Sequence, residues 1–149
     1  MNAETIIEIL GLEPLPGEGG FFRESYRSAN SSAIYYLVTP ASYSRLHRLP
    51  KDELLHFYLG DPVETVQIDA RGDFRREILG ADLGAGERPQ VLVPARTWQG
   101  SRLKAGGSYA LLGATLAPGY EPSDLELADG ETLAKQFPRY RELILELSR

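Results

Sequence analysis

The chain has 149 residues, of which 42% are hydrophobic and 25% are charged, and this composition excludes a disordered chain and suits one domain with a buried core. The formal net charge of −5, with acids and bases interspersed, excludes the basic stripe that a nucleic-acid-binding protein uses. The lack of cysteine excludes disulfides, cysteine-ligated zinc and a thiol nucleophile, so any metal must be held by histidine and carboxylate.

The first predicted element is a short helix over residues 5–10. Ile6, Ile7 and Leu10 follow helical spacing, and Gly11 stands where a helix C-cap favours glycine. The acids before this apolar stretch, with no basic residue, do not resemble a signal peptide. No stretch approaches the roughly 20 apolar residues of a membrane span. We therefore expect a cytoplasmic protein that is not bound to a membrane.

Short runs rich in β-branched and aromatic residues follow, separated by proline, glycine, aspartate and asparagine. The predicted strands are residues 21–27, 32–38, 44–49, 54–59, 63–68, 74–79, 90–93, 97–103 and 108–116. No long helix separates these runs, so antiparallel pairing in a sandwich or barrel is expected. The sequence GEGG at residues 17–20 lacks the lysine of a phosphate-binding loop and opens onto a strand, so it predicts a turn.

The end of the chain changes from strand to helix periodicity. Tyr140, Leu143, Ile144 and Leu147 lie on one face of a helix, and Pro138 stands in a position that opens it. This helix is expected to pack on the outside of the barrel. Residues 1–149 are thus predicted to form a single all-β domain with short N-terminal and C-terminal helices.

Residues 41–60 keep the spacing of the first sequence motif of cupins. His47 stands at the first histidine, Leu49 at the second, Glu53 at the glutamate and Gly60 at the closing glycine, whereas Ala41 replaces the opening glycine. The second motif would fall on Pro94, Arg96 and Gln99, and only its proline is kept.

Longer stretches resemble the Cupin_5 family, formerly the domain of unknown function DUF985, in the RmlC-like cupin superfamily. They are LGLEPLPGEGGFFRESYRS, SSAIYYLVTP, HRLPKDELLHFYLGDPVE, VLVPARTWQGSRL and APGYEPSDLELA. This resemblance implies a double-stranded β-helix, or jelly-roll, barrel with a small-molecule pocket in its lumen, in many cases as a homodimer. It implies no established reaction.

His47 and Glu53 are the candidate catalytic pair, because imidazole titrates near neutrality and a neighbouring carboxylate orients it. The pair resembles that of metal-free sugar-nucleotide epimerases, which use a histidine base and a tyrosine acid, so Tyr36 or Tyr43 is expected to supply the phenol. The alternative is a satisfied polar pair in a barrel core. If Glu53 points inward, alternation also sends Leu55, Phe57 and Leu59 inward and turns His56 outward.

The candidate ligand-binding residues are Arg23, Arg45, Phe57 and Gln99. Arg23, Arg45 and Arg96 are candidates to clamp a carboxylate or phosphate of a ligand. A divalent metal would have only His47, Glu53 and Gln99, because Leu49 cannot be a ligand and a metal centre needs three or four converging donors. The expected site therefore contains no metal and no cofactor.

Three functions remain open. The first is a metal-independent isomerase or epimerase acting on a sugar or sugar-nucleotide, the second a non-catalytic ligand-binding or sensory module, and the third a metal-dependent oxygenase or isomerase. The exposed edges of jelly-roll sheets also predict a homodimer.

Overall fold

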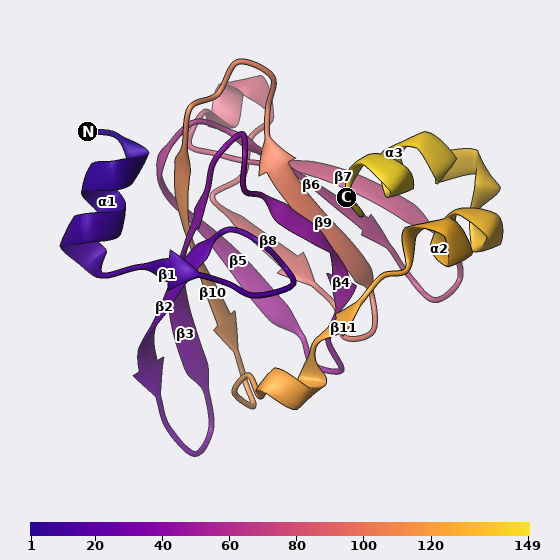
Figure 1. Cartoon of the computed structure of the whole chain (residues 1–149), viewed down its shortest axis with the longest axis horizontal. Helices are drawn as coiled ribbons and strands as arrows, with labels where there is room; N and C mark the ends of the chain where they lie inside the picture. The colour runs from indigo at the N-terminus through magenta and orange to yellow at the C-terminus, as the bar shows by residue number, and fades with distance from the viewer.

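Two antiparallel β-sheets, stacked face to face, form the body of the computed structural model, which describes residues 1–149 (Figure 1). The six-stranded sheet has the order β1 (Glu13–Pro14), β2 (Phe21–Arg27), β3 (Ser32–Val38), β10 (Ala110–Leu116), β5 (Glu53–Gly60) and β8 (Gln90–Val93). The five-stranded sheet has the order β11 (Glu126–Leu127), β4 (Ser44–Arg48), β9 (Trp98–Leu103), β6 (Val63–Ile68) and β7 (Phe74–Leu79). The predicted all-β, two-sheet jelly-roll architecture is confirmed.

The predicted strands all occur, and β2, β3, β6, β7 and β8 have the predicted bounds. The other four differ at their ends by one or two residues. The two-residue strands β1 and β11 were not predicted, because a run of two residues has no measurable alternation.

Helix α1 (Ala3–Leu10) lies beside the six-stranded sheet, near the N-terminus (Figure 1). The Asn2 side chain accepts a hydrogen bond from the Thr5 amide at 2.9 Å, and Gly11 ends the helix with a φ of 64°. Buried Ile6 packs with Leu37 and Leu111 of the sheet. The predicted N-terminal helix and its glycine cap are therefore confirmed.

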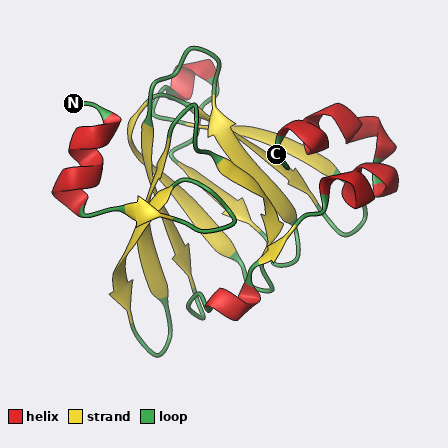
Figure 2. Ribbon diagram, in the orientation of Figure 1, coloured by secondary structure: helices red, strands yellow, loops and turns green.

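Helices α2 (Gly130–Gln136) and α3 (Arg141–Glu146) cover the five-stranded sheet from outside, as Figure 2 shows. They are joined by a 3₁₀ turn over Pro138–Tyr140, and two more such turns lie at Leu83–Ala85 and Pro122–Asp124. Buried Leu133, Ile144 and Leu147 pack against a patch that includes Leu46 and Ile68. The final helix was predicted, whereas α2 was not, because its only apolar residues, Leu133 and Ala134, are adjacent and show no helical repeat. None of the helices is long and apolar enough to cross a membrane.

The space between the two sheets is filled at one end and hollow at the other. Val38, Val63, Leu79 and Ala110 are fully buried at the filled end. Toward the other end the same core contains Tyr36, Leu55, Leu112 and Ala114, which also line a cavity. The sandwich is therefore packed as a core at one end and contains a cavity at the other.

Two β-bulges change which side chains face this space. In β4, Ser44 pairs with Ser101 of β9 and His47 pairs with Gln99, so β4 has one more residue between these pairs than β9 has. In β5, Tyr58 is the extra residue between two paired neighbours. The prediction that Leu59 points inward is wrong, because the bulge reverses the alternation and leaves Leu59 40% exposed.

Candidate functional site

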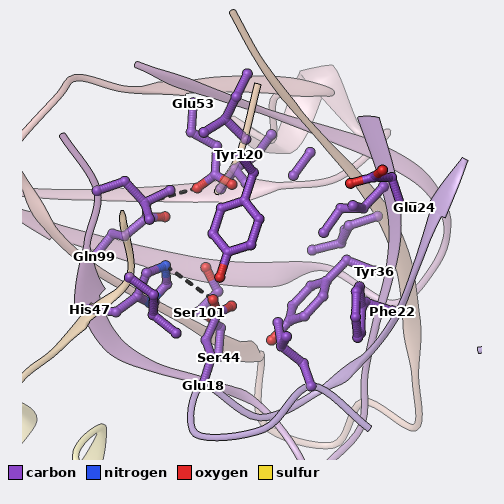
Figure 3. A pocket seen from close by; sticks show the side chains of 18 of the residues that line it. Glu18, Phe22, Glu24, Tyr36, Ser44, His47, Glu53, Gln99, Ser101 and Tyr120 are labelled. Atoms are coloured by element: carbon purple, nitrogen blue, oxygen red, sulfur yellow. Dashed lines mark hydrogen bonds and ion pairs between the residues drawn. The ribbon is translucent and has the colours of Figure 1, made fainter. Parts of the chain in front are cut away.

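A cavity of about 440 Å³ opens between the two sheets (Figure 3). The five-stranded sheet lines it with polar side chains, which are Ser44, His47, Gln99 and Ser101. The six-stranded sheet lines it largely with apolar ones, among them Phe22, Ile34, Leu55, Leu112 and Ala114. A concave, partly apolar site with a few converging polar groups is typical of small-molecule binding.

His47 presents one ring nitrogen to the cavity. Its Nδ1 lies 2.7 Å from the carbonyl oxygen of Arg45, which only accepts hydrogen bonds, so Nδ1 carries a hydrogen. In the neutral ring Nε2 then has a free lone pair, and it lies 3.4 Å from Oε1 of Glu18. His47 is therefore oriented to accept a proton at Nε2, next to a carboxylate that stabilises the resulting imidazolium.

Glu53 is a buried carboxyl on the otherwise apolar wall, with 8% of its surface exposed. The Gln99 amide donates a hydrogen bond to its Oε1 at 2.8 Å. The pKa of Glu53 is raised to about 7, chiefly by burial. The charge of His47 lowers this pKa, the charge of Glu18 raises it, and the hydrogen bond from Gln99 lowers it. At neutral pH the group is therefore divided between its acid and carboxylate forms.

Glu18 was missed by the sequence interpretation, although the turn that carries it was predicted. Its Oε2 accepts a hydrogen bond from the Ser44 hydroxyl at 2.9 Å. Gly19 follows with a φ of 96°, and a Cβ there would lie 2.2 Å from the Tyr43 carbonyl oxygen. The GEGG sequence thus allows the chain to turn tightly and place a carboxylate beside His47. A lone acid flanked by glycines at the start of a barrel strand is the signal that points to it.

Tyr36 lines the cavity, but its hydroxyl is already engaged. The Tyr36 hydroxyl donates a hydrogen bond to the Gly19 carbonyl oxygen at 2.5 Å. Burial, followed by the charge of Glu18, raises the pKa of Tyr36 well above its usual value. Tyr43, the alternative phenol, donates to the Glu146 carbonyl oxygen at 3.1 Å and does not line the cavity.

Tyr120 is a second phenol in the cavity, and the sequence interpretation missed it. Its ring lies between the His47 and Gln99 side and the Tyr36 side of the cavity, and its hydroxyl points toward Ser101 and Glu18 (Figure 3). Burial, followed by the charges of Glu18, Asp124 and Glu53, raises the pKa of Tyr120. Its only sequence signal is its place in the family-like stretch APGYEPSDLELA, because a loop residue follows no strand period.

Tyr120 belongs to residues 117–125, which we call the mouth segment. The Tyr120 amide donates to the Ser32 hydroxyl at 2.8 Å. Lys51 donates through Nζ to the Gly119 carbonyl oxygen and to Asp124, each at 2.7 Å. Pro122 and Leu125 of this segment also line the cavity. The phenol is therefore held by contacts at both ends of its segment.

Of the seven predicted site residues, the structure brings together Tyr36, His47, Glu53 and Gln99. Arg23 is exposed and donates to the Leu10 carbonyl oxygen at 3.1 Å, because its neighbours Phe22 and Glu24 take the inward positions of β2. Arg45 is exposed and donates to the Gly17 carbonyl oxygen at 3.3 Å, because the bulge in β4 turns it out of the cavity.

Phe57 packs against the hydrophobic core beyond Leu55 and does not line the cavity. His56 faces away from it, as expected, and its Nε2 lies 2.9 Å from the Thr115 hydroxyl. Arg96 is exposed outside the cavity lining, with a φ of 63°.

The donors near His47 do not fit a metal centre. No group of three or more histidine, cysteine, aspartate and glutamate side chains is placed to hold a metal ion. Leu49 lies in the cavity wall at the position of the second motif histidine, and the Gln99 amide nitrogen is directed at Glu53. The trio of His47, Glu53 and Gln99 offers one neutral amide and no third strong donor.

The two-sheet fold, with His47, Glu53 and Gln99 in its lumen, defines a protein of the cupin class. The family model described as Cupin_5, Cupin superfamily (DUF985), matches residues 4–128. The chain belongs to this family, as its sequence motifs indicated.

Two solved structures are similar over nearly their whole length. Protein SO0799 from Shewanella oneidensis is 37% identical, with a TM-score of 0.94 over 100% of this chain and 98% of its own. A hypothetical protein from Leishmania major is 31% identical, with a TM-score of 0.93 over 99% of both chains.

More distant matches share the fold alone. Oxalate decarboxylase from Bacillus subtilis at pH 4.6 is 16% identical, with a TM-score of 0.62 over 91% of this chain and 37% of its own. No functionally curated protein matches the chain. The family and fold are thus established, and the function has to be inferred from the site.

Proposed function

We propose that the cavity is a metal-independent acid–base site that isomerises or epimerises a small molecule by proton transfer. One observation carries this proposal: the hydrogen bond from His47 Nδ1 to the Arg45 carbonyl oxygen makes Nε2 the nitrogen that takes and gives the proton, and Nε2 faces the cavity with Glu18 at 3.4 Å. This arrangement supports a base whose protonated form has a counter-charge ready.

The reaction begins when Nε2 of His47 takes a proton from a carbon next to a carbonyl group. The electron pair of the broken C–H bond moves to the carbonyl oxygen, which becomes an enolate. The imidazolium is stabilised by Glu18, which is held by the Ser44 hydroxyl. The enolate oxygen takes a proton from a phenol of the cavity, which leaves a phenolate. Epimerisation follows when the phenolate takes this proton back and the imidazolium returns its proton to the opposite face of the same carbon, after the enol has turned in the cavity. In an α-hydroxy carbonyl compound, isomerisation follows when the phenolate instead takes the proton of the α-hydroxyl and the imidazolium returns its proton to the former carbonyl carbon. Glu18 therefore takes the role of histidine partner that the sequence assigned to Glu53.

The acid for the enolate oxygen is Tyr120 in preference to Tyr36. The Tyr36 hydroxyl already donates its hydrogen bond to the Gly19 carbonyl oxygen, whereas the Tyr120 hydroxyl points toward Ser101 and Glu18 on the polar side of the cavity (Figure 3). Glu53, on β5 beside the start of the mouth segment, remains to bind a polar group of the substrate. The roles of His47, Glu18 and Tyr120 are thus divided among β4, the turn before β2 and the mouth segment.

The charges of the lining favour an unphosphorylated substrate over a sugar-nucleotide. The lining contains no lysine, and its single arginine, Arg27, is paired with Glu24 through Nε at 2.8 Å. A phosphate would thus meet Glu18 and Glu53 without a free guanidinium or ammonium to receive it. Homodimer formation and a cytoplasmic location stay predictions from the sequence.

The experiment is proton exchange in D₂O. Unphosphorylated hydroxyaldehydes, hydroxyketones and amino sugars are incubated with the protein, and incorporation of deuterium at carbon is followed by NMR. We expect incorporation into at least one compound, and a rate lower by about 10²- to 10⁴-fold for His47→Gln, since that is the usual contribution of a general base. His56→Gln, at the other histidine of the chain, is the matched control and keeps the rate. Equal rates in wild type and His47→Gln would exclude the proposed base.

A second candidate is a binding module that performs no reaction. It is favoured by Leu49, an apolar residue that lines the cavity beside His47 where a second polar group would serve catalysis. Binding of a compound without deuterium incorporation would select this function.

A further inference from the structure

Three carboxylates line the cavity, and they differ in the partner that balances their charge. Glu18 faces His47 at 3.4 Å. Glu24 pairs with Arg27, whose Nε and Nη2 donate to its two oxygens at 2.8 and 2.9 Å. Glu53 accepts a hydrogen bond from the neutral amide of Gln99 and forms no ion pair, and the one cationic influence on it is that of His47, which already faces Glu18. The most buried carboxylate of the lining is therefore the one without an ion-pair partner of its own.

An ionised carboxylate in an apolar wall is costly unless a cation or several donors face it. Only Oε1 of Glu53 accepts a hydrogen bond from the chain, and no fully buried side-chain oxygen lacks a partner. Its Oε2 is thus open toward the cavity. The chain leaves room for a ligand to supply the missing donor at this atom.

Aromatic rings lie around the same space. Phe22, Tyr36 and Tyr120 line the cavity, with the Tyr120 ring near Glu53 in Figure 3. The faces of such rings attract a cation, most strongly where water is excluded. The only arginine in the lining is already paired with Glu24 and with Glu121 at 3.3 Å. Carboxylate and rings therefore favour a positive ligand, and the two groups of the lining that can carry a positive charge, Arg27 and His47, already face Glu24 and Glu18.

We infer that the ligand of this cavity is a small organic amine, bound through its protonated nitrogen to Glu53 and through its apolar part to the wall of Phe22, Ile34 and Leu112. This inference rests on the proposed function, because it places the ligand in the same cavity: the amine lies at Glu53 and the reacting carbon at His47. A compound that carries both an amino group and a carbonyl group can meet both requirements, because its ammonium binds Glu53 while the carbon next to its carbonyl reaches His47. Anionic ligands are rejected for lack of a cation to receive them.

Binding of the amine depends on the ionisation of Glu53. The titratable groups around this carboxyl are His47 of β4, Glu18 of the turn before β2, Tyr36 of β3 and Tyr120 of the mouth segment, and Gln99 of β9 supplies the neutral donor. Because the pKa of Glu53 is about 7, the carboxylate form grows as the pH rises through neutrality. Amine affinity is expected to rise between about pH 6 and pH 8, over which an alkylamine stays protonated.

The test uses three probes that share one apolar body: cyclohexylmethylamine, cyclohexylmethanol and cyclohexanecarboxylate. Their dissociation constants are measured at about pH 8 by NMR titration of the whole protein. We expect the amine to bind at least about tenfold more tightly than the alcohol, since a hydrogen bond between charged groups is stronger than a neutral one, and the carboxylate to bind most weakly. In Glu53→Gln the amine loses its advantage over the alcohol and its pH dependence.

Glu64→Gln is the matched control, because Glu64 is also buried but is paired with Arg76 at 2.8 Å outside the cavity. This variant keeps the preference for the amine. Wild-type protein that binds the alcohol or the carboxylate as tightly as the amine, or no binding of the amine at millimolar concentration, overturns the inference without any variant. In His47→Gln the preference for the amine survives loss of proton exchange, so failure of the reaction and failure of the ligand assignment are distinguishable.

Discussion

The six-stranded sheet lines the cavity with Phe22, Ile34 and Leu112, whereas the five-stranded sheet lines it with His47, Gln99 and Ser101. The difference follows from what covers the outer faces. Helices α2 and α3 bury apolar side chains on the outside of the five-stranded sheet, and this packing stabilises the sheet from behind. Its inward positions are therefore free to carry hydrogen-bonding groups. Helix α1 covers the outer face of the six-stranded sheet around Leu37 and Leu111 but leaves Tyr26 and Tyr58 exposed, so this sheet supplies the apolar wall of the cavity from its inward face.

The largest effect on stability is expected from truncating a side chain of the apolar wall. Leu112 is 2% exposed and belongs both to the core and to the cavity lining. Leu112→Ala should lower the free energy of unfolding by about 2–5 kcal/mol, because it removes buried methyl groups and leaves a void. Urea unfolding measures this loss. Leu92→Ala, at a leucine that is 50% exposed, should change stability by no more than about 0.5 kcal/mol. Equal losses in the two variants would contradict the assignment of this wall as core.

A smaller effect is expected from the ionisation of Glu53, the buried acid on the apolar wall. Its pKa is about 7 in the folded chain and 4.5 in its ordinary environment, so the folded protein keeps the proton to higher pH than the unfolded chain. The stability that this proton contributes is fully present below the unfolded value and is lost as the pH rises through about 7. Between about pH 5 and pH 8 wild type should lose about 2–3 kcal/mol relative to Glu53→Gln. Urea unfolding of both proteins at both pH values tests this, and parallel pH profiles would show that Glu53 is not the responsible group.

The smallest effect is expected from altering one polar residue opposite Glu53. Gln99→Leu removes the hydrogen bond to Oε1, which favours the ionised form, so the pKa of Glu53 should rise further. Titration of the Glu53 carboxyl carbon by NMR, assigned by its loss in Glu53→Gln, measures the change. Gln67→Leu is the control, because Gln67 is buried in the same sheet but donates to the Leu92 carbonyl oxygen at 3.1 Å. A pKa of Glu53 that is unchanged in Gln99→Leu would show that the hydrogen bond does not tune it.

Sequence patterns predicted the strands because strands alternate regularly, and motif spacing pointed to His47, Glu53 and Gln99, which line the cavity. The spacing of His47 and Glu53 within the motif was enough to place both in the cavity. The pattern failed wherever one residue was inserted, so Arg45 and Leu59 face outward as a result of the bulges in β4 and β5.

Loop residues were beyond the reach of periodicity for a different reason. Glu18 and Tyr120 reach the cavity from a glycine turn and from the mouth segment, and their positions are set by contacts with Ser44 and Ser32 that lie far away in the sequence. Such contacts exist only once the sheets have formed. The residues that the sequence interpretation missed were thus those supplied by irregular backbone.

Most strands of the sandwich both pair in a sheet and line the cavity, whereas the mouth segment only lines the cavity. Residues 117–125 contribute Tyr120, Pro122 and Leu125 to the cavity, yet they add no strand to either sheet and are tethered by Ser32 and Lys51. A change of sequence in this loop can therefore alter the shape and chemistry of the cavity without changing the register of any strand. The fold carries an exchangeable part, by which one scaffold can be adapted to different ligands while its core sequence stays the same.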